Sequence, residues 1–231
     1  MRQLRGVHGS SLKQLHPILK RWVRLMEDPE WWRYDKVADA PWWYNERALL
    51  SLFAGAIWRS RGVAFEEFVA TKRQRTRQRG RRRGHNAGTR GDLMFWWADR
   101  RLYFISEAKR VELPLQLAPA RLRQQIGDEV HNCISDVRLH PRESKVRRLG
   151  ILFIAPRFAR GVGNHHPLSR DEYGQLSAFG DLLKDLSAEW ECTTAWTFPG
   201  VFPRPKGVLP SVGTYAYPGA AIVIADAKSW R

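Results

Sequence analysis

The sequence predicts an α/β fold with a central mixed β-sheet flanked by helices, because two hydrophobic periods alternate along the chain. Apolar residues recur at helical spacing at about 10–26, 45–59, 120–137 and 171–186. Between and after these segments lie short apolar or alternating runs that are typical of strands. Six such strands are expected, at 63–71, 92–97, 101–111, 148–155, 191–197 and 221–225.

Residues 1–44 are expected to form a helical, tryptophan-rich extension that packs on a domain made by residues 45–231. Ser10 or Ser11 can cap its helix, and Pro17 either kinks that helix or marks its first turn. The tryptophans from Trp31 to Trp43 lie in an irregular segment. They could stack on nucleic-acid bases, but packing of the extension onto the core is the simpler interpretation.

The helix at 45–59 should begin at Asn45, a favourable N-cap residue. Glu46 then lies in its first turn, where a carboxylate either stabilises the helix dipole or serves a nearby site. Gly62 is expected to end the helix.

Positive charge restricts the partners of the chain. The 231 residues carry a formal net charge of +16, which exceeds what solubility requires. Nucleic acid is the commonest polyanion that such a surface attracts. A generally basic surface, or a patch for acidic lipid or an acidic protein, is the alternative.

The cations cluster in residues 72–84, which favours nucleic acid over these alternatives. This segment holds eight cations and no acid, and from Arg79 onward its glycines indicate a loop. His85 beside it can touch the substrate or be an ordinary surface histidine. The cations expected to hold a nucleic-acid backbone are Lys72, Arg73, Arg75, Arg77, Arg79, Arg81, Arg82 and Arg83.

Two strands joined by a tight turn at 98–100 form a predicted hairpin with unusual polar residues. Glu107 and Lys109 share one face of the second strand with Tyr103 and Ile105, a set that suggests burial. Asp92 opens the first strand and therefore comes near them. Carboxylates bind hard cations such as Mg²⁺, and the cation activates water against a phosphodiester. A lysine can position or help to deprotonate that water, or balance charge, and small residues near Asp92 would let a phosphate approach.

Gly91-Asp92, the hairpin and Glu107-Ala108-Lys109 resemble the PD-(D/E)xK nuclease superfamily, which includes restriction endonucleases. The resemblance covers residues 45–155 and implies a restriction-endonuclease-like core. It also implies Asp92, Glu107 and the carbonyl of Ala108 as ligands of Mg²⁺, with Mn²⁺ able to substitute, and Lys109 as the catalytic lysine.

Other positions match the superfamily in part. Many members add an acid on the preceding helix, where Glu46 lies, and some add a glutamine on the next helix, which Gln124 or Gln125 can match. Gln125 is accordingly a candidate nucleic-acid contact, although both glutamines can be plain surface residues. The superfamily's proline is replaced by Gly91.

An acid-x-lysine tripeptide alone is weak support, since Glu143-Ser-Lys145 and Asp226-Ala-Lys228 also occur. Glu143 lies in a polar stretch that indicates a solvated loop, and Asp226 has neither an acid-bearing hairpin partner nor a following helix. Only Glu107 follows a strand that an acid opens and precedes a helix and an apolar strand. The tripeptide could still be a surface ion pair, of little energetic value.

The expected activity is Mg²⁺-dependent hydrolysis of DNA phosphodiesters by an endonuclease, with DNA more strongly expected than RNA. A nucleic-acid-binding protein with the same fold but no activity, or an RNA-directed nuclease, is the alternative. A homodimer is compatible with this activity, because a double-strand cut needs two centres.

Several classes of protein are excluded. No apolar run reaches the roughly 18–20 residues that span a bilayer, and the N-terminus lacks the apolar stretch of a signal peptide. Cys133 and Cys192 have no metal-ligand spacing and cannot form a disulfide framework, so a cytoplasmic location is expected.

Overall fold

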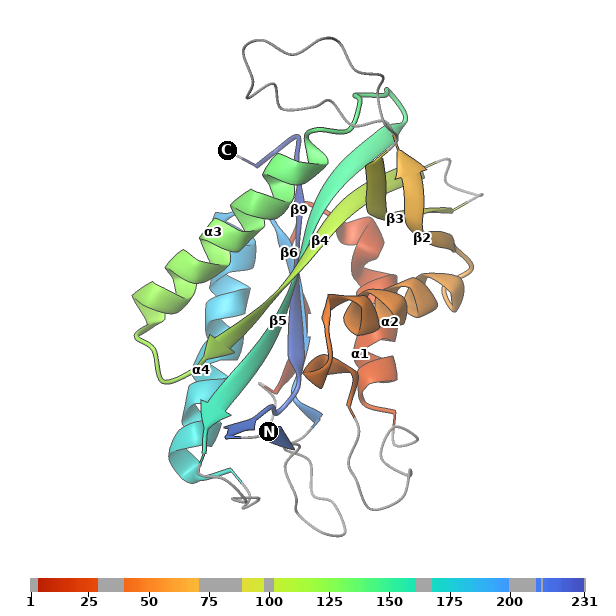
Figure 1. Cartoon of the computed structure of the whole chain (residues 1–231). Helices are drawn as coiled ribbons and strands as arrows, with labels where there is room; N and C mark the ends of the chain where they lie inside the picture. Colours follow the sequence, from red (N-terminus) through yellow and green to blue (C-terminus); the bar gives the residue numbers. More distant parts are fainter. Residues whose placement is uncertain are drawn as a thin grey trace, which may run out of the picture.

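The structure is a computed structural model that describes residues 4–28, 40–70, 89–97, 102–160, 168–199, 211–212 and 214–230. These residues form an α/β protein built on a mixed, open sheet, so the predicted fold class is confirmed at this level. The sheet lies between two pairs of helices (Figure 1). Element boundaries differ from the predicted ones by a few residues.

The main sheet has the strand order β1-β6-β9-β5-β4-β3-β2. Only the β4–β5 pair is parallel, and its neighbours along the sheet pair antiparallel. A small hairpin of β7 and β8 attaches to the end of β5. The strands are β1 (Arg5–His8), β2 (Val63–Ala70), β3 (Thr89–Trp97), β4 (Leu102–Pro114), β5 (Val146–Ala159), β6 (Thr193–Thr197), β7 (Ser211–Val212), β8 (Tyr215–Ala216) and β9 (Ala220–Asp226).

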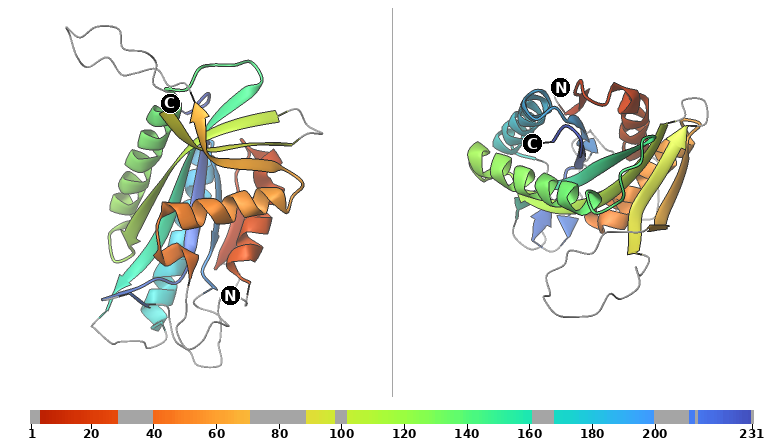
Figure 2. Two further views of the ribbon diagram at one scale, coloured as in Figure 1. Left: turned by 45° about the vertical axis from the view of Figure 1, so that its right-hand side comes forward. Right: turned by 90° about the horizontal axis from the view of Figure 1, so that it is seen from above.

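In the described part of the chain, four α-helices cover the sheet in two pairs, α1 with α2 on one face and α3 with α4 on the other (Figures 1 and 2). The sheet twists, so the strands near β2 are turned strongly relative to those near β1 (Figure 2). The helices are α1 (His16–Met26), α2 (Glu46–Trp58), α3 (Pro119–Val137) and α4 (Arg170–Glu189), with short 3₁₀ turns η1 (Lys13–Leu15) and η3 (Pro41–Trp43).

Each helix pair buries its own hydrophobic cluster against the sheet. On the α1–α2 face, Trp22, Phe53, Phe95 and Phe104 are fully buried. On the other face, α3 and α4 pack over β5, β9 and β6, and Ile126 is among the fully buried residues. Burial on both faces explains the nearly continuous apolar run of β5.

The predicted start of α2 is confirmed. The Asn45 side chain accepts a hydrogen bond of 3.1 Å from the backbone N–H of Ala48, which caps the helix. The helix ends in a turn in which the N–H of Gly62 donates to the carbonyl of Ile57 at 3.0 Å. This start places Glu46 at the first position of α2, next to the strands that carry the other candidate residues.

The predicted cap of α1 by Ser10 or Ser11 is wrong. The turn η1 precedes α1, Leu15 is the N-cap residue, and no side chain caps the helix. Pro17 lies in the first turn of α1, so the alternative that it marks the helix start is the correct one.

The N-terminal segment also contains a strand that the sequence did not predict. β1 pairs with β6 and forms one edge of the sheet, so residues 4–28 share the sheet and core with later segments. Trp42 is fully buried, and its indole Nε1 donates to the carbonyl of Tyr217 at 3.2 Å. These contacts agree with packing of the N-terminal segment onto the core. The tryptophans at 31 and 32 lie outside the described residues.

The hairpin of β3 and β4 opens at one end. Its ladder runs from Trp97–Leu102 to Leu93–Ser106 and stops there, while β4 continues beside β5 as far as Pro114. The first residues of β3 remain paired with β2 instead. The strands β3 and β4 therefore separate just where Asp92 and Glu107 are placed. The turn at 98–100 lies outside the described residues.

No helix in the described part of the chain is long and apolar enough to cross a membrane.

Candidate functional site

Asp92 binds the backbone of the predicted tripeptide. Its Oδ2 accepts a hydrogen bond of 2.7 Å from the N–H of Ala108, the residue between Glu107 and Lys109. The N–H and C=O of a strand residue point to the same side, so the carbonyl of Ala108 also faces the opening between β3 and β4. The predicted convergence of Asp92 with this tripeptide is therefore present.

Glu107 is held by a histidine that the sequence analysis missed. Its Oε1 lies 2.6 Å from Nε2 of His140, and the two side chains are 10% and 0% exposed. His140 follows α3 in the chain, and its ring stacks on Phe68 of β2 with centroids 6.0 Å apart. Its Nδ1 is buried and has no hydrogen-bond partner among the described residues. A lone histidine 33 residues after Glu107 carries no spacing signal that could have found it.

The face of β4 is only partly as predicted. Glu107 is buried, but Tyr103 on the same face is 40% exposed. The expectation that Tyr103 and Ile105 bury this face is wrong for Tyr103, which lies at the turn end of the hairpin, and Ile105 is half-buried. Burial of Glu107 comes instead from the segment after α3 that carries His140.

Gly91 has a packing role in the structure, and the approach of a phosphate to Asp92 stays a prediction. A Cβ added at this position would lie 2.4 Å from Cζ of Phe68 and 3.1 Å from Cε1 of His140. Gly91 and Phe68 are partners in the β2–β3 ladder. The glycine is explained by these two rings, which occupy the space that a side chain would need.

Lys109 pairs with Asp136 of α3, a residue that the sequence analysis also missed. The Nζ–Oδ2 distance is 2.9 Å, and both side chains are about one-third exposed or more. The hydrogen bond with Asp136 is the main cause that raises the pKa of Lys109, and the charges of Asp136 and Glu46 act in the same direction. Lys109 is therefore held as an ammonium, which disfavours a role in removing a proton from water.

Glu46 interacts with this group from the start of α2. Burial raises its pKa from 4.5 to about 7, and the negative charges of Asp92 and, less strongly, Glu107 act in the same direction. The ammonium of Lys109 and a hydrogen bond from the backbone N–H of Arg110 lower the pKa and offset part of that shift. Three carboxylates from α2, β3 and β4 therefore interact around the tripeptide.

The other two acid-x-lysine tripeptides lie outside this site, one in an exposed loop and one at the end of a strand. Glu143 and Lys145 are exposed in the loop before β5. Asp226 is buried at the end of β9, where its Oδ2 accepts from Nε of Arg147 at 2.9 Å and its Oδ1 accepts from the backbone N–H of Lys228. Its partners stabilise the turn that follows the strand.

The predicted nucleic-acid contacts are placed only in part. The residues Lys72, Arg73, Arg75, Arg77, Arg79, Arg81, Arg82, Arg83 and His85 lie outside the described residues. Gln124 and Gln125 are exposed on α3. Gln125 lies one helical turn before Glu129, on the stripe of α3 that continues to Cys133 and Asp136.

The donor chemistry of this site fits a hard divalent cation. Carboxylate and backbone carbonyl oxygens are the ligands that Mg²⁺ takes. Burial, and after it the negative charges of Asp92 and Glu107, raises the pKa of Glu46, and a cation would offset this charge repulsion. In the described part of the chain, no three His, Cys, Asp or Glu side chains form a ligand cluster. Mg²⁺ does not require one, because it usually keeps several waters and binds one or two carboxylates.

Known proteins give no assignment for this chain: comparisons with family models, with curated proteins and with solved structures found no significant match.

Proposed function

We propose that the protein is a metal-dependent nuclease whose active centre lies where β3 and β4 separate. One observation carries the proposal: Oδ2 of Asp92 is bonded to the N–H of Ala108, which places this carboxylate against the Glu107-Ala108-Lys109 segment. An acid and an acid-x-lysine segment that meet across an opened hairpin are the arrangement expected from the resemblance to PD-(D/E)xK nucleases.

The order of elements supports a restriction-endonuclease-like core. From α2 onward the chain forms a helix, three antiparallel strands, a helix and a strand parallel to β4. This order agrees with the core that the resemblance implies. Glu46 supports it too, since it approaches Asp92 and Glu107 from the helix before the first strand.

Asp92, Glu107 and the carbonyl of Ala108 would hold Mg²⁺ or Mn²⁺, and Glu46 would complete the set. When bound, such an ion polarises a phosphate and lowers the pKa of a coordinated water. His140 fixes the rotamer of Glu107 through the hydrogen bond of 2.6 Å. Partners of this kind orient ligands and strengthen metal binding in many proteins.

Lys109 would act as a fixed positive charge. Asp136 holds its ammonium at 2.9 Å and raises its pKa, so Lys109 stabilises negative charge that develops on the phosphate or orients the attacking water. In this proposal Lys109 is not the base.

DNA is the proposed substrate, with the residues 72–83 and His85 as contacts to its backbone and Gln125 as a further contact. The net charge of +16 supports a polyanionic substrate. A homodimer would allow a double-strand cut, because each copy supplies one centre.

The experiment is incubation of the protein with supercoiled plasmid DNA and Mg²⁺. The variant Asp92→Ala/Lys109→Ala should lose cleavage, whereas Glu143→Ala/Lys145→Ala should keep it, since that exposed tripeptide has the same chemistry outside the centre. Equal cleavage by wild type and the first variant would refute the assigned centre. Cleavage of RNA but not DNA would favour the RNA-directed alternative.

A further inference from the structure

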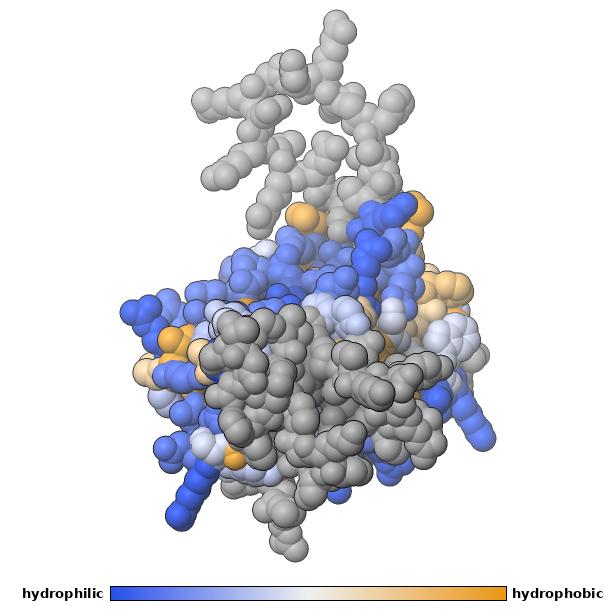
Figure 3. Space-filling view, turned by 60° about the horizontal axis from the view of Figure 1, so that its bottom comes forward, coloured by the Kyte–Doolittle hydropathy of each residue, from blue (hydrophilic) through white to orange (hydrophobic). Residues whose placement is uncertain are grey.

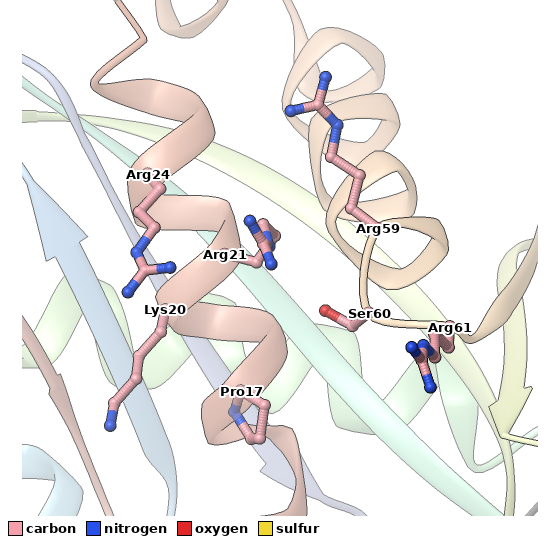
Figure 4. A pocket seen from close by; sticks show the side chains of 7 residues that line it. All are labelled: Pro17, Lys20, Arg21, Arg24, Arg59, Ser60 and Arg61. Atoms are coloured by element: carbon pink, nitrogen blue, oxygen red, sulfur yellow. The ribbon is translucent and has the colours of Figure 1, made fainter.

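A groove with a cavity of about 400 Å³ lies between α1 and the C-terminal end of α2 (Figure 4). Arg21 points from α1 toward the turn that follows α2, where Ser60 and Arg61 lie (Figure 4). The residues that line it are Pro17, Lys20, Arg21, Arg24, Arg59, Ser60 and Arg61.

Five of the seven lining residues are cations and none is an acid. Among the described residues, none of the five forms an ion pair, and four of them are exposed. Elsewhere exposed arginines do pair: Arg47 and Arg90 both contact Glu67. Five cations around one cavity repel one another, so a bound anion would lower the energy of this arrangement.

Local structure holds these cations in place. The helix α1 buries its apolar residues against the sheet, which leaves Lys20 and Arg24 on its exposed face. The turn after α2 is fixed by Arg61, which adopts a left-handed conformation with φ of 61°, and by Ser60, whose carbonyl accepts from the indole Nε1 of Trp97 at 3.3 Å.

The helix dipole accounts for only part of this charge. Cations near a helix C-terminus are favourable, which explains Arg59 and Arg61 after α2 and Arg24 in the last turn of α1. It does not explain Lys20 and Arg21, which lie before the last turn of α1. Cations from both helices are therefore gathered around one groove, and the helix dipole does not require all of them there.

A space-filling view from below shows another part of the surface of the molecule (Figure 3). Most of the coloured atoms on that face are hydrophilic, and apolar residues occur there in small separate groups (Figure 3).

We propose that this groove binds phosphate groups of a nucleic-acid backbone at a distance from the active centre. The 13 residues of α2 join the two places, with Glu46 at one end and Arg59 just past the other. A helix of this length spans about 20 Å, which corresponds to roughly six phosphates along one strand of a duplex. A duplex of ordinary length is therefore long enough to reach from one place to the other. This role rests on the proposed nuclease function for the identity of the polymer, but phosphate binding by the groove is independent of cleavage.

The test measures binding of a duplex oligonucleotide in EDTA, so that cleavage plays no part. The groove variant is Lys20→Gln/Arg24→Gln/Arg59→Gln. Its matched control, Lys184→Gln/Arg121→Gln/Arg170→Gln, removes one lysine and two arginines that are equally exposed on α3 and α4. Both variants lose three charges, so bulk electrostatics change alike. Thermal melts of both proteins show that each remains folded.

The groove variant should bind on the order of 10–100-fold more weakly near 0.1 M salt. The slope of log K against log salt should become shallower by about 2–3, since each lost phosphate contact lowers it by roughly 0.9. The control should change both quantities much less. Equal losses in the two variants would overturn the proposal, because they would show a nonspecific charge effect.

A second arm distinguishes lipid from nucleic acid. Vesicles that contain phosphatidylserine are tested with the same proteins, and loss of vesicle binding in the groove variant with unchanged DNA binding would overturn the proposal. Failure of the nuclease assignment would be seen separately. In that case Asp92→Ala/Lys109→Ala would still cleave plasmid DNA, while the groove variant would still bind DNA more weakly than wild type.

Discussion

Glu107 and His140 share a buried hydrogen bond of 2.6 Å between Oε1 and Nε2. The bond joins the middle of β4 to the segment after α3, and Phe68 of β2 stacks on the other side of the histidine. A carboxylate on a strand is thereby fixed by two parts of the chain that are distant in sequence. Its orientation depends on the packing of α3 as much as on the hairpin.

Replacement of His140 should therefore affect both stability and the site. His140→Ala leaves the buried Oε1 of Glu107 without this partner and opens a cavity, so the free energy of unfolding should fall by about 2–4 kcal/mol. The Mg²⁺ concentration for half-maximal cleavage should rise roughly 10–100-fold, as for other partners of metal ligands.

Urea denaturation and Mg²⁺ titrations of cleavage measure the two effects. His140→Gln keeps a donor and should recover part of both. Ile126→Ala, in the core under α3, provides a variant of comparable stability loss. If it raised the Mg²⁺ requirement as much as His140→Ala, the effect would be one of stability alone.

Gly91→Ala should destabilise the protein by about 1–3 kcal/mol, because the new Cβ would lie 2.4 Å from Cζ of Phe68. The double variant Gly91→Ala/Phe68→Leu should recover much of this loss, since the smaller side chain vacates the space. Urea denaturation of the two single variants and the double variant measures the coupling.

Gly174→Ala is the control for the Gly91 substitution. It lies in α4 with no atom within 4 Å of the added Cβ, and it should stabilise by about 0.5–1 kcal/mol. Additive effects at Gly91 and Phe68 would show that their packing is not the reason for the glycine.

Local patterns predicted the parts of the site that lie close in sequence. Asn45 was identified as a cap because capping needs only the first turn of a helix. Asp92 was placed near Glu107 and Lys109 because a hairpin fixes its register through a short turn. The faces of the helices followed from the spacing of their apolar residues.

Contacts between distant segments could not be predicted in this way. His140 and Asp136 reach β4 only because α3 packs across it, and nothing in their own neighbourhood marks them. The pairing of β1 with β6 joins residues almost 190 positions apart, and β1 has only four residues. The need for a glycine at position 91 is set by Phe68 and His140, because a side chain there would meet both rings.

Lys109→Gln should slow cleavage strongly while the protein stays folded. Loss of a preorganised positive charge at the reacting phosphate should lower the rate by roughly 100-fold or more. The ion pair with Asp136 is partly exposed, so the free energy of unfolding should change by less than about 1 kcal/mol. Single-turnover cleavage and urea denaturation measure the two quantities.

Asp136→Asn tests whether Asp136 acts through Lys109. It removes the charge that holds the ammonium but not the ammonium itself, so its rate should lie between those of wild type and Lys109→Gln. Lys145→Gln, in the exposed loop, should cleave as wild type does. A normal rate in Lys109→Gln would remove this residue from the centre.

Glu46 should make the metal-free protein less stable as the pH rises. Its pKa is about 7 in the folded protein, above the value of 4.5 for an unperturbed glutamate. Between these two values the folded state binds more protons than the unfolded state, so the free energy of unfolding falls as the pH rises from about 4.5 through 7. Glu46→Gln cannot ionise, so in EDTA its stability relative to wild type should increase between pH 5 and pH 8.

Mg²⁺ should reverse this advantage of Glu46→Gln over wild type at high pH, because a divalent cation binds the ionised carboxylates and offsets their repulsion. Thermal melts should show that Mg²⁺ stabilises wild type more at pH 8 than at pH 5, and that it stabilises Glu46→Gln less at pH 8. A stability difference between the two proteins that does not change with pH in EDTA would show that burial and the neighbouring carboxylates do not raise the pKa of Glu46 in the folded protein. If the stability difference in EDTA changes with pH as expected but Mg²⁺ stabilises neither protein, the electrostatic interaction of Glu46 with Asp92 and Glu107 stands. Glu46 is then excluded as a cation ligand.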